Sequence, residues 1–300
     1  MHRKDFAVID APSILGLRPT GVELLADALK AAGLIEKLHA EYIGKIMPYS
    51  SYNYERDRVT GLLNPLAIKY FSLRLAGVVR DVICRNKFPI VLGGDCSILI
   101  GNVLALKQLS RYGLFFIDGH ADFYKPEQSP TGEVADMDLR IVSGHGPDIL
   151  SNLNGLKPLI LEQDIVVFGY RDGEQSASYG CEDIKKVTRM HAIDLLDVRN
   201  MGLKNAANLA IDKVLSKNEI SGFWIHLDAD VLDDSIMPAV DYRIPGGITY
   251  SELTDLLKLL LATNLATGMS ITIFNPLLDK EGSIVRNFVS SIVNGFSSNS

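Results

Sequence analysis

Two short segments of the sequence carry closely spaced side chains that can bind metal ions. The segment FFIDGHADFY holds Asp118, His120 and Asp122, and the segment FWIHLDADVLDD holds Asp228 and Asp230. Alternate residues of an extended chain lie on one face, so each segment can direct its side chains to one point. A single Asp pair at a strand end is more often a turn or helix-cap feature, but two such clusters favour a shared site.

Carboxylates gathered in this way need a cation between them. Each pair of like unit charges ~4 Å apart costs on the order of 4 kcal/mol at an effective dielectric near 20. Oxygen ligands with one imidazole suit Mn²⁺ or a similar divalent ion, and bridging carboxylates favour two ions about 3.5–4 Å apart. The two segments therefore predict a dinuclear metal site.

A cysteine at a third position is a further candidate metal ligand. The segment VLGGDCSILI places Cys96 where an apolar strand turns toward a helix, and ligands gather at the carboxyl ends of strands in α/β sheets. Core packing is the alternative, since buried cysteine is common. The three cysteines show no CxxC spacing, which argues against a disulfide framework and is typical of a reduced compartment.

Elements of alternating type must position these residues. Apolar runs rich in Val, Ile and Phe predict strands at 5–10, 43–48, 88–93, 113–118, 164–169, 187–193, 222–228 and 267–274. Residues with a helical period predict helices near 21–33, 66–86, 97–110, 203–217, 250–263 and 281–296. Strands that alternate with helices indicate an α/β protein with a parallel sheet of about eight strands and helices on both faces.

Composition limits the classes of function. The chain has 300 residues, is 47% hydrophobic and 22% charged, and carries a net charge of −6. These values are typical of a globular chain, and no linker divides residues 1–300, which predicts a single domain. The negative charge predicts no nucleic acid partner. The short apolar stretches and the absence of a secretory leader predict no membrane association and a cytoplasmic location.

The three motifs together resemble a known family. The segments GGDCS (93–97), DGHAD (118–122) and HLDADVLDD (226–234) are similar to GGDHS, DAHxD and SxDxDxxDP of the ureohydrolases, which include arginase, agmatinase and formimidoylglutamase. The resemblance extends over nearly the whole chain. It implies a three-layer α/β/α fold with an eight-stranded, mostly parallel sheet. It further implies two Mn²⁺ ions at the strand ends, a small guanidino or amidino substrate, and a homo-oligomer, either a trimer or a hexamer.

The resemblance assigns a role to each ligand position. Asp118 and Asp228 match carboxylates that bridge both ions, and His120 and Asp230 match ligands of one ion. The metal-ligand positions are Cys96, Asp118, His120, Asp122, Asp228 and Asp230. In the family, a metal-bridging hydroxide attacks the trigonal carbon of the substrate.

Asp122 and Cys96 match ligands of the other ion. The family counterpart of Asp122 also accepts a hydrogen bond from the hydroxide, which makes Asp122 a catalytic candidate. Cys96 stands where the family has histidine, and thiolate binds Mn²⁺ less well than it binds Zn²⁺, Ni²⁺ or Fe²⁺. Three outcomes stay open: a dinuclear cluster with one Cys ligand, a site tuned to another metal, or a half-empty site.

Two positions in the pocket depart from arginase. Ala135 stands near a position where arginases have a histidine that shuttles protons. Ile273 replaces a glutamate that binds the guanidinium, and Ser270 is the closest polar alternative. Loss of a charge-assisted contact disfavours plain arginine. The sequence is similar to a Cys-bearing branch, which favours an amidinohydrolase of N-hydroxy-arginine; a formimidoylglutamase-like enzyme and a non-catalytic binding or regulatory protein are the alternatives.

Several further residues are candidates for contact with the substrate. In FGYRDGE, Asp172 or Glu174 matches a segment that binds the α-amino group of the substrate, and Tyr124 is a candidate for the pocket wall. His145 is a candidate to replace the absent proton shuttle, with a surface turn as the alternative. His226 matches a position beside the ligands, where packing or a hydrogen bond to a ligand is expected.

Overall fold

Eight parallel strands form one sheet in the computed structural model, which describes residues 4–215 and 219–297. The strands are β1 (Phe6–Asp10), β2 (Glu41–Lys45), β3 (Phe88–Leu92), β4 (Gly113–Ile117), β5 (Ile165–Phe168), β6 (His191–Ile193), β7 (Phe223–Asp228) and β8 (Ala266–Thr272). Their order is β2-β1-β3-β8-β7-β4-β5-β6, and every pairing is parallel. The predicted eight-stranded α/β/α fold is confirmed.

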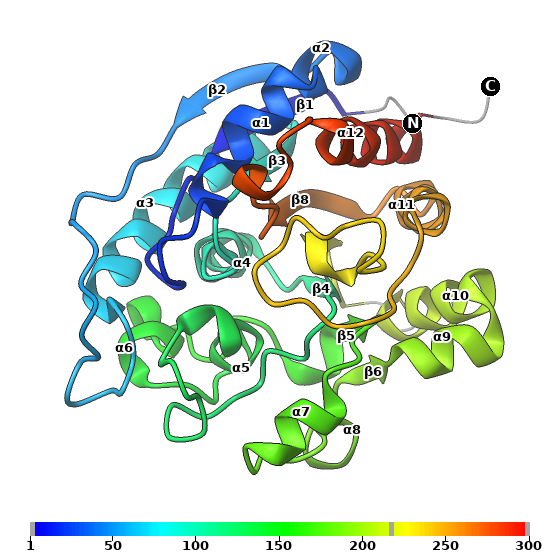
Figure 1. Cartoon of the computed structure of the whole chain (residues 1–300). Helices are drawn as coiled ribbons and strands as arrows, with labels where there is room; N and C mark the ends of the chain where they lie inside the picture. Colours follow the sequence, from blue (N-terminus) through cyan, green and yellow to red (C-terminus); the bar gives the residue numbers. More distant parts are fainter. Residues whose placement is uncertain (1–3, 216–218, 298–300) are drawn as a thin grey trace.

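Helices cover both faces of the sheet (Figure 1). The α-helices of the described residues are α1 (Leu25–Ala31), α2 (Leu34–Leu38), α3 (Pro65–Cys84), α4 (Ile98–Leu109), α5 (Asp138–Val142), α6 (Asp148–Ser151), α7 (Gly173–Ser178), α8 (Ile184–Val187), α9 (Leu195–Met201), α10 (Leu203–Leu215), α11 (Tyr250–Ala262) and α12 (Ser283–Phe296). Short 3₁₀ turns are η1 (Val22–Leu24), η2 (Val134–Asp136), η3 (Leu153–Gly155), η4 (Glu162–Asp164), η5 (Ala229–Val231) and η6 (Pro276–Leu278). Helices α3 to α6 pack on one face, and α1, α2 and α9 to α12 pack on the other.

The core lies on both sides of the sheet because its strands are apolar on both faces. In β1, Val8 packs toward α1 and α12, whereas Ala7 and Ile9 pack toward α3 and α4. The runs FPIVL of β3 and GLFFI of β4 are buried throughout, as expected for the inner strands of a parallel sheet. The strands that end at the candidate site therefore come from the buried centre of the sheet.

All eight predicted strands and all six predicted helices are present, with shifted ends. The strand expected at 187–193 is reduced to β6, because residues before it form α8 and a bend. Residues 216 and 217, at the end of one predicted helix, lie outside the described residues. The short helices α2 and α5 to α9 are absent from the prediction, since each is too brief to show a clear period. No helix among the described residues has the length and apolar character needed to span a bilayer.

Candidate metal centre

The six predicted metal ligands converge at the carboxyl ends of three neighbouring elements. Cys96 lies between β3 and α4, while the DGHAD segment follows β4 directly. Asp228 ends β7, and Asp230 lies in the adjoining 3₁₀ turn η5. Strand β8 separates β3 from β7, so four adjacent strands frame the site. The predicted clustering of these residues is present in the structure.

Local hydrogen bonds fix the direction of the carboxylates. Asp118 Oδ1 accepts from His120 N at 2.7 Å, and Asp228 Oδ1 accepts from Asp230 N at 2.8 Å. Each aspartate thus closes a turn over its own backbone. Gly119 N donates to Asp230 Oδ1 at 2.9 Å, and a Cβ at Gly119 would lie 2.7 Å from Asp230 O. Glycine is required there because the two loops approach so closely.

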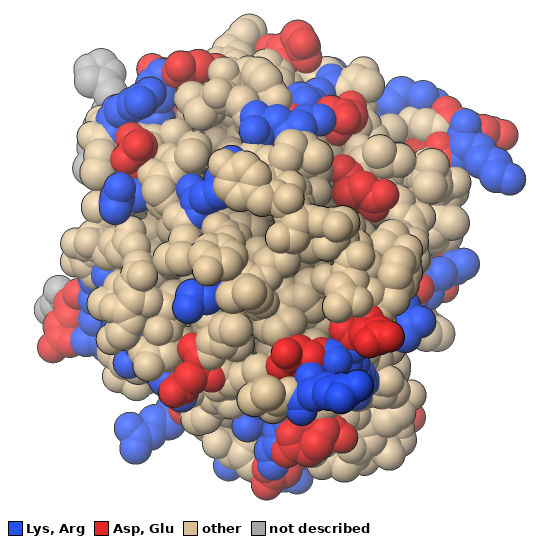
Figure 2. All heavy atoms as spheres, turned by 90° about the vertical axis from the view of Figure 1, so that its left-hand side faces the viewer, with Lys and Arg blue, Asp and Glu red and all other residues tan. Residues whose placement is uncertain are grey.

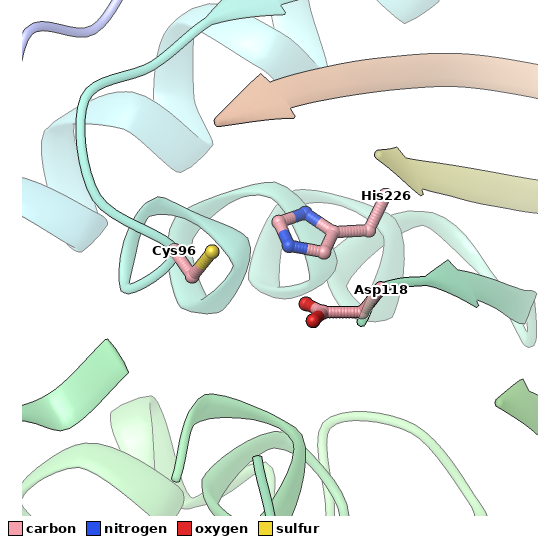
Figure 3. Close-up of side chains that lie close together, drawn as sticks. All are labelled: Cys96, Asp118 and His226. Atoms are coloured by element: carbon pink, nitrogen blue, oxygen red, sulfur yellow. The ribbon is translucent and has the colours of Figure 1, made fainter. Parts of the chain in front are cut away.

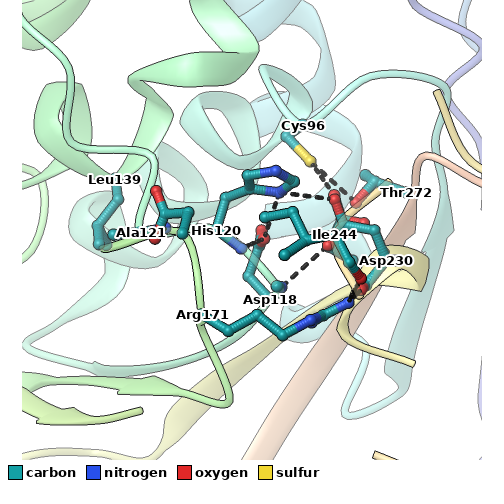
Figure 4. A network of polar contacts seen from close by, with 12 residues as sticks. Cys96, Asp118, His120, Ala121, Leu139, Arg171, Asp230, Ile244 and Thr272 are labelled. Carbon is teal, nitrogen blue, oxygen red and sulfur yellow. Dashed lines mark hydrogen bonds and ion pairs between the residues drawn. The ribbon is translucent and has the colours of Figure 1, made fainter. Parts of the chain in front are cut away.

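Arg171 holds the loop after β7 in place (Figure 4). Its Nη2 donates to Asp230 O at 2.8 Å and to Ile244 O at 3.0 Å, and its Nε donates to Pro245 O at 3.2 Å. The guanidinium is therefore committed to backbone carbonyls and positions the loop rather than the substrate.

Two sets of three donor atoms are close enough to hold metal ions. One set is Asp118, His120 and Asp230, and the other is Cys96, Asp118 and His226; within each, the donor atoms lie within 4.8 Å of one another. Asp118 belongs to both sets, which is the arrangement expected of a bridging carboxylate. Asp118 Oδ2 is buried without a hydrogen-bond partner among the described residues. The residues present therefore fit a pair of cations.

The charges at this site favour the binding of cations. Burial, together with neighbouring carboxylates, raises the pKa of Asp118, Asp122 and Asp228. Burial would lower the pKa of His120, but Asp230, whose Oδ2 lies 2.8 Å from Nδ1, outweighs it and raises the pKa to about 9. Burial would raise the pKa of Asp230, but the neighbouring His120 outweighs this effect and lowers it. Without metal, bound protons reduce the repulsion between these carboxylates, and metal binding must displace those protons.

Cys96 points into the cluster rather than into the core. Its Sγ lies 2.7 Å from Asp228 Oδ2 and 3.2 Å from Thr272 Oγ1 (Figure 4). Burial raises the pKa of the thiol, and the nearby carboxylates raise it further. A thiol in this position donates to a carboxylate when no metal is bound, and its thiolate is available to a cation.

A cavity of about 110 Å³ lies over the ligands, and a larger one of about 370 Å³ adjoins it at Tyr124. The wall of the smaller cavity includes Leu17, Tyr124, Thr131, Ala135, Asp136, Tyr179, Tyr242 and Ile273. Figure 2 views the molecule from the side toward which β2 and β8 point in Figure 1, and uncharged residues occupy most of this face. By its volume, the smaller cavity has room for a small planar group, and the larger cavity has room for a chain attached to that group.

The predicted substrate contacts differ in their placement. Tyr124 lines both cavities. Asp172 is buried at the larger one; its Oδ1 accepts from Ala121 N at 3.2 Å, and its Oδ2 has no partner among the described residues. Glu174 is exposed in the first turn of α7 and lines neither cavity described above. Asp172 is thus the better placed of the two carboxylates.

The sequence did not single out Asp136, which lines the smaller cavity. Its Oδ2 accepts from Ser129 Oγ at 2.7 Å and from Thr131 Oγ1 at 3.0 Å. Burial raises the pKa of its carboxyl group. The one available signal was its place directly after Ala135, where arginases have the histidine that shuttles protons.

Two candidates lie away from the cavities. His145 matches the surface-turn alternative: it lines neither cavity, and its Nε2 lies 2.6 Å from Glu162 Oε1 in an exposed loop. Ser270, the suggested polar replacement in the pocket, instead lies below the cluster, where its Oγ contacts Trp224 Nε1 and His226 Nδ1. Ser270 lies within β8, whereas Ile273 lies beyond the end of the strand with φ of 71°, so the two side chains take different directions.

The parallel sheet and the paired donor sets define an α/β metallohydrolase with a two-metal centre. The arginase family description matches residues 4–296, so the chain belongs to the arginase family of metal-dependent ureohydrolases. An arginase of Staphylococcus aureus (strain COL) is 32% identical over 96% of both chains. The crystal structure of Bacillus caldovelox arginase superposes with a TM-score of 0.86 at 27% identity over 99% of both chains. A Bacillus subtilis formimidoylglutamase shares the fold, with a TM-score of 0.75 at 18% identity over 98% of this chain and 86% of that one.

Proposed function

We propose that this chain hydrolyses the guanidino C–N bond of a compound less basic than arginine, with N-hydroxy-arginine as the candidate substrate. The observation that supports the proposal is Ile273, which lines the cavity over the ligands where arginases have a guanidinium-binding glutamate. Its φ is 71°, a strained conformation for a β-branched residue. The backbone thus keeps an apolar side chain in the cavity wall, beside the space for the guanidino group.

An N-hydroxyguanidine fits beside the apolar side chain of Ile273 better than a charged guanidinium does. Its electron-withdrawing hydroxyl group lowers the pKa of the guanidine, so a neutral form needs no counterion. A plain guanidinium at the same place lacks a charge-assisted contact that is worth about 1.5–3 kcal/mol. The pocket therefore offers a guanidinium no directional contact at this wall, and the neutral form loses nothing by its absence.

Asp122 and Asp136 have separate roles in the proposed proton transfers. Two divalent ions held by these residues, expected to be Mn²⁺ unless Cys96 shifts the preference, would supply Lewis-acid activation of a water molecule. Asp122, one of the six predicted ligands, would also accept a hydrogen bond from that water. Asp136, which lines the smaller cavity, is the candidate group to pass a proton to the departing amine in place of the absent histidine.

The larger cavity receives the amino acid end of the substrate. Asp172 offers its unpartnered Oδ2 to an α-amino group, Glu174 is the alternative partner, and Tyr124 forms the wall between the two cavities. A trimer or hexamer stays a prediction from the family, which light scattering of the purified protein tests.

The deciding experiment compares kcat/KM for N-hydroxy-L-arginine, L-arginine, agmatine and N-formimino-L-glutamate on Mn²⁺-loaded protein. We expect the hydroxylated substrate to be favoured over L-arginine by at least about tenfold, from the contact energy above. Equal turnover of L-arginine would refute the proposal. A preference for the formimino compound would move the chain to the second candidate substrate class. Metal content near two ions per chain is the control for loading.

A further inference from the structure

His226 occupies a place on β7 that directs it toward the metal ligands. It precedes Asp228 by two residues, so both side chains lie on the same face of the sheet. The strand register places it beside Phe116 of β4 and Ser270 of β8. The rings of His226 and Phe116 stack with centroids 5.0 Å apart. These neighbours thus fix the plane of the His226 imidazole, two residues before Asp228 on the same face of β7.

Hydrogen bonds fix which nitrogen faces the cluster. His226 Nδ1 lies 2.9 Å from Ser270 Oγ, which also accepts from Trp224 Nε1 at 3.0 Å. The indole N–H can only donate, and the serine oxygen has a second lone pair that can accept from an Nδ1–H donor. In that tautomer of His226 the lone pair of Nε2 is free, and metal binding at Nε2 selects it. Metal-binding histidines are usually held in this way, by a hydrogen bond from the other ring nitrogen.

His226 Nε2 has no hydrogen-bond partner among the described residues, although the side chain is fully buried. Buried polar atoms are nearly always paired, so this one needs an explanation. Figure 3 shows the imidazole directed toward the same space as the Cys96 thiol and the Asp118 carboxylate. The donor atoms of these three residues lie within 4.8 Å of one another, a spacing that one ion can span.

We propose that His226 is a metal ligand, and that its Nε2, Cys96 Sγ and an Asp118 oxygen surround one of the two ion positions. The family motifs have histidine at position 96 and serine at position 226, so this chain moves the imidazole from the β3 loop to β7 and adds a thiolate. The other position, formed by Asp118, His120 and Asp230, keeps mainly oxygen ligands.

The two positions therefore differ in the ions they select. Thiolate and imidazole favour Zn²⁺, Fe²⁺, Co²⁺ or Ni²⁺ over Mn²⁺, whereas carboxylates suit Mn²⁺. We expect the position at Cys96 and His226 to take the softer ion from a mixture. This inference rests on the metal dependence of the proposed function but not on its substrate, so a wrong substrate would leave it intact.

The direct test is anomalous diffraction from crystals of the wild-type protein loaded with Zn²⁺ or Co²⁺. The result expected is an ion about 2.0–2.2 Å from His226 Nε2 and about 2.3 Å from Cys96 Sγ. An ion bound by Cys96 with Nε2 more than about 3 Å away would overturn the proposal. This measurement needs no variant and no turnover.

A solution test uses His226→Ala, with His145→Ala as the matched control because His145 lies outside the cluster. Co²⁺ is titrated into chelator-treated protein, and the thiolate-to-cobalt absorption band reports the position at Cys96. We expect His226→Ala to weaken this binding by at least about tenfold and to leave a second, weaker-absorbing ion bound. Wild-type affinity and an unchanged band in a folded His226→Ala protein would overturn the assignment.

Discussion

Removal of the metal should make the stability of this protein fall as the pH rises. Without metal, buried Asp118, Asp122 and Asp228 have raised pKa values, and Asp230 raises the pKa of His120 to about 9. The folded chain then binds more protons than the unfolded chain above about pH 4. The perturbation is exhaustive chelation, followed by thermal unfolding at several pH values.

The sign follows from the direction of the shifts. A group with a raised folded pKa contributes its full stability below its unfolded pKa, and this contribution is lost as the pH rises through the folded pKa. Each carboxyl that stays protonated only in the folded state lowers the free energy of unfolding by about 1.4 kcal/mol per pH unit. His120, whose folded pKa is about 9, loses about 2 kcal/mol of stabilisation between roughly pH 6.5 and 8.5. The buried carboxyl groups, whose folded pKa values are also raised, add to the fall in the same direction.

The assay is differential scanning calorimetry of metal-free and metal-loaded protein at both pH values. At roughly 2 °C per kcal/mol, the metal-free Tm should fall by about 4 °C or more between them. The loaded protein should show no such fall, because its ligands are deprotonated throughout and metal binds more tightly as protons leave. Asp228→Asn should reduce the slope, whereas Asp255→Asn, an exposed change on α11, should not. A flat or rising Tm in the metal-free protein would refute the reasoning.

Three substitutions test the remaining assignments. Asp118→Asn should reduce the metal content below that of the wild type at both positions, since Asp118 belongs to both donor sets; full content by mass spectrometry would contradict a bridging role. Cys96→His should raise Mn²⁺ occupancy at subsaturating metal, because imidazole replaces a softer donor; unchanged occupancy would show that Cys96 binds no ion. Ile273→Glu should raise kcat/KM for L-arginine about tenfold or more, with Ile273→Leu as the control, and no gain would remove Ile273 as the basis of substrate choice.

The sheet was predictable because its strands are buried on both faces. A strand such as GLFFI has no polar position, so a short apolar run identifies it without knowledge of its neighbours. The long helices α3 and α11 were predictable for the related reason that an apolar stripe repeats along several turns. Helices such as α5 and α9, with five and seven residues, have too few turns for a stripe. Their positions depend on packing that a local pattern does not record.

The convergence of the predicted ligands could be foreseen because most of them lie within two short segments at strand ends. His226 was harder to assign, since its role depends on the register that places it beside Ser270 and on an unpaired nitrogen. Asp136 lines the smaller cavity because of the path of its loop, which a local sequence pattern does not record. His145 illustrates the opposite error, because a histidine close in sequence to DGHAD pairs with Glu162 instead. Spacing within a segment was informative, and proximity along the chain was not.

The departures from the family motifs are electrostatically linked across the cleft. Thiolate at Cys96 replaces a neutral imidazole and adds one negative charge beneath the cavity, whereas Ile273 removes one negative charge from its wall. Moving the imidazole to His226 changes the donor set but not the net charge. The cavity therefore keeps its overall attraction for a cation while losing the directional, bidentate contact that fixes a guanidinium. Discrimination against arginine should thus come from orientation rather than from weaker encounter, so it should fall mainly on kcat and less on KM.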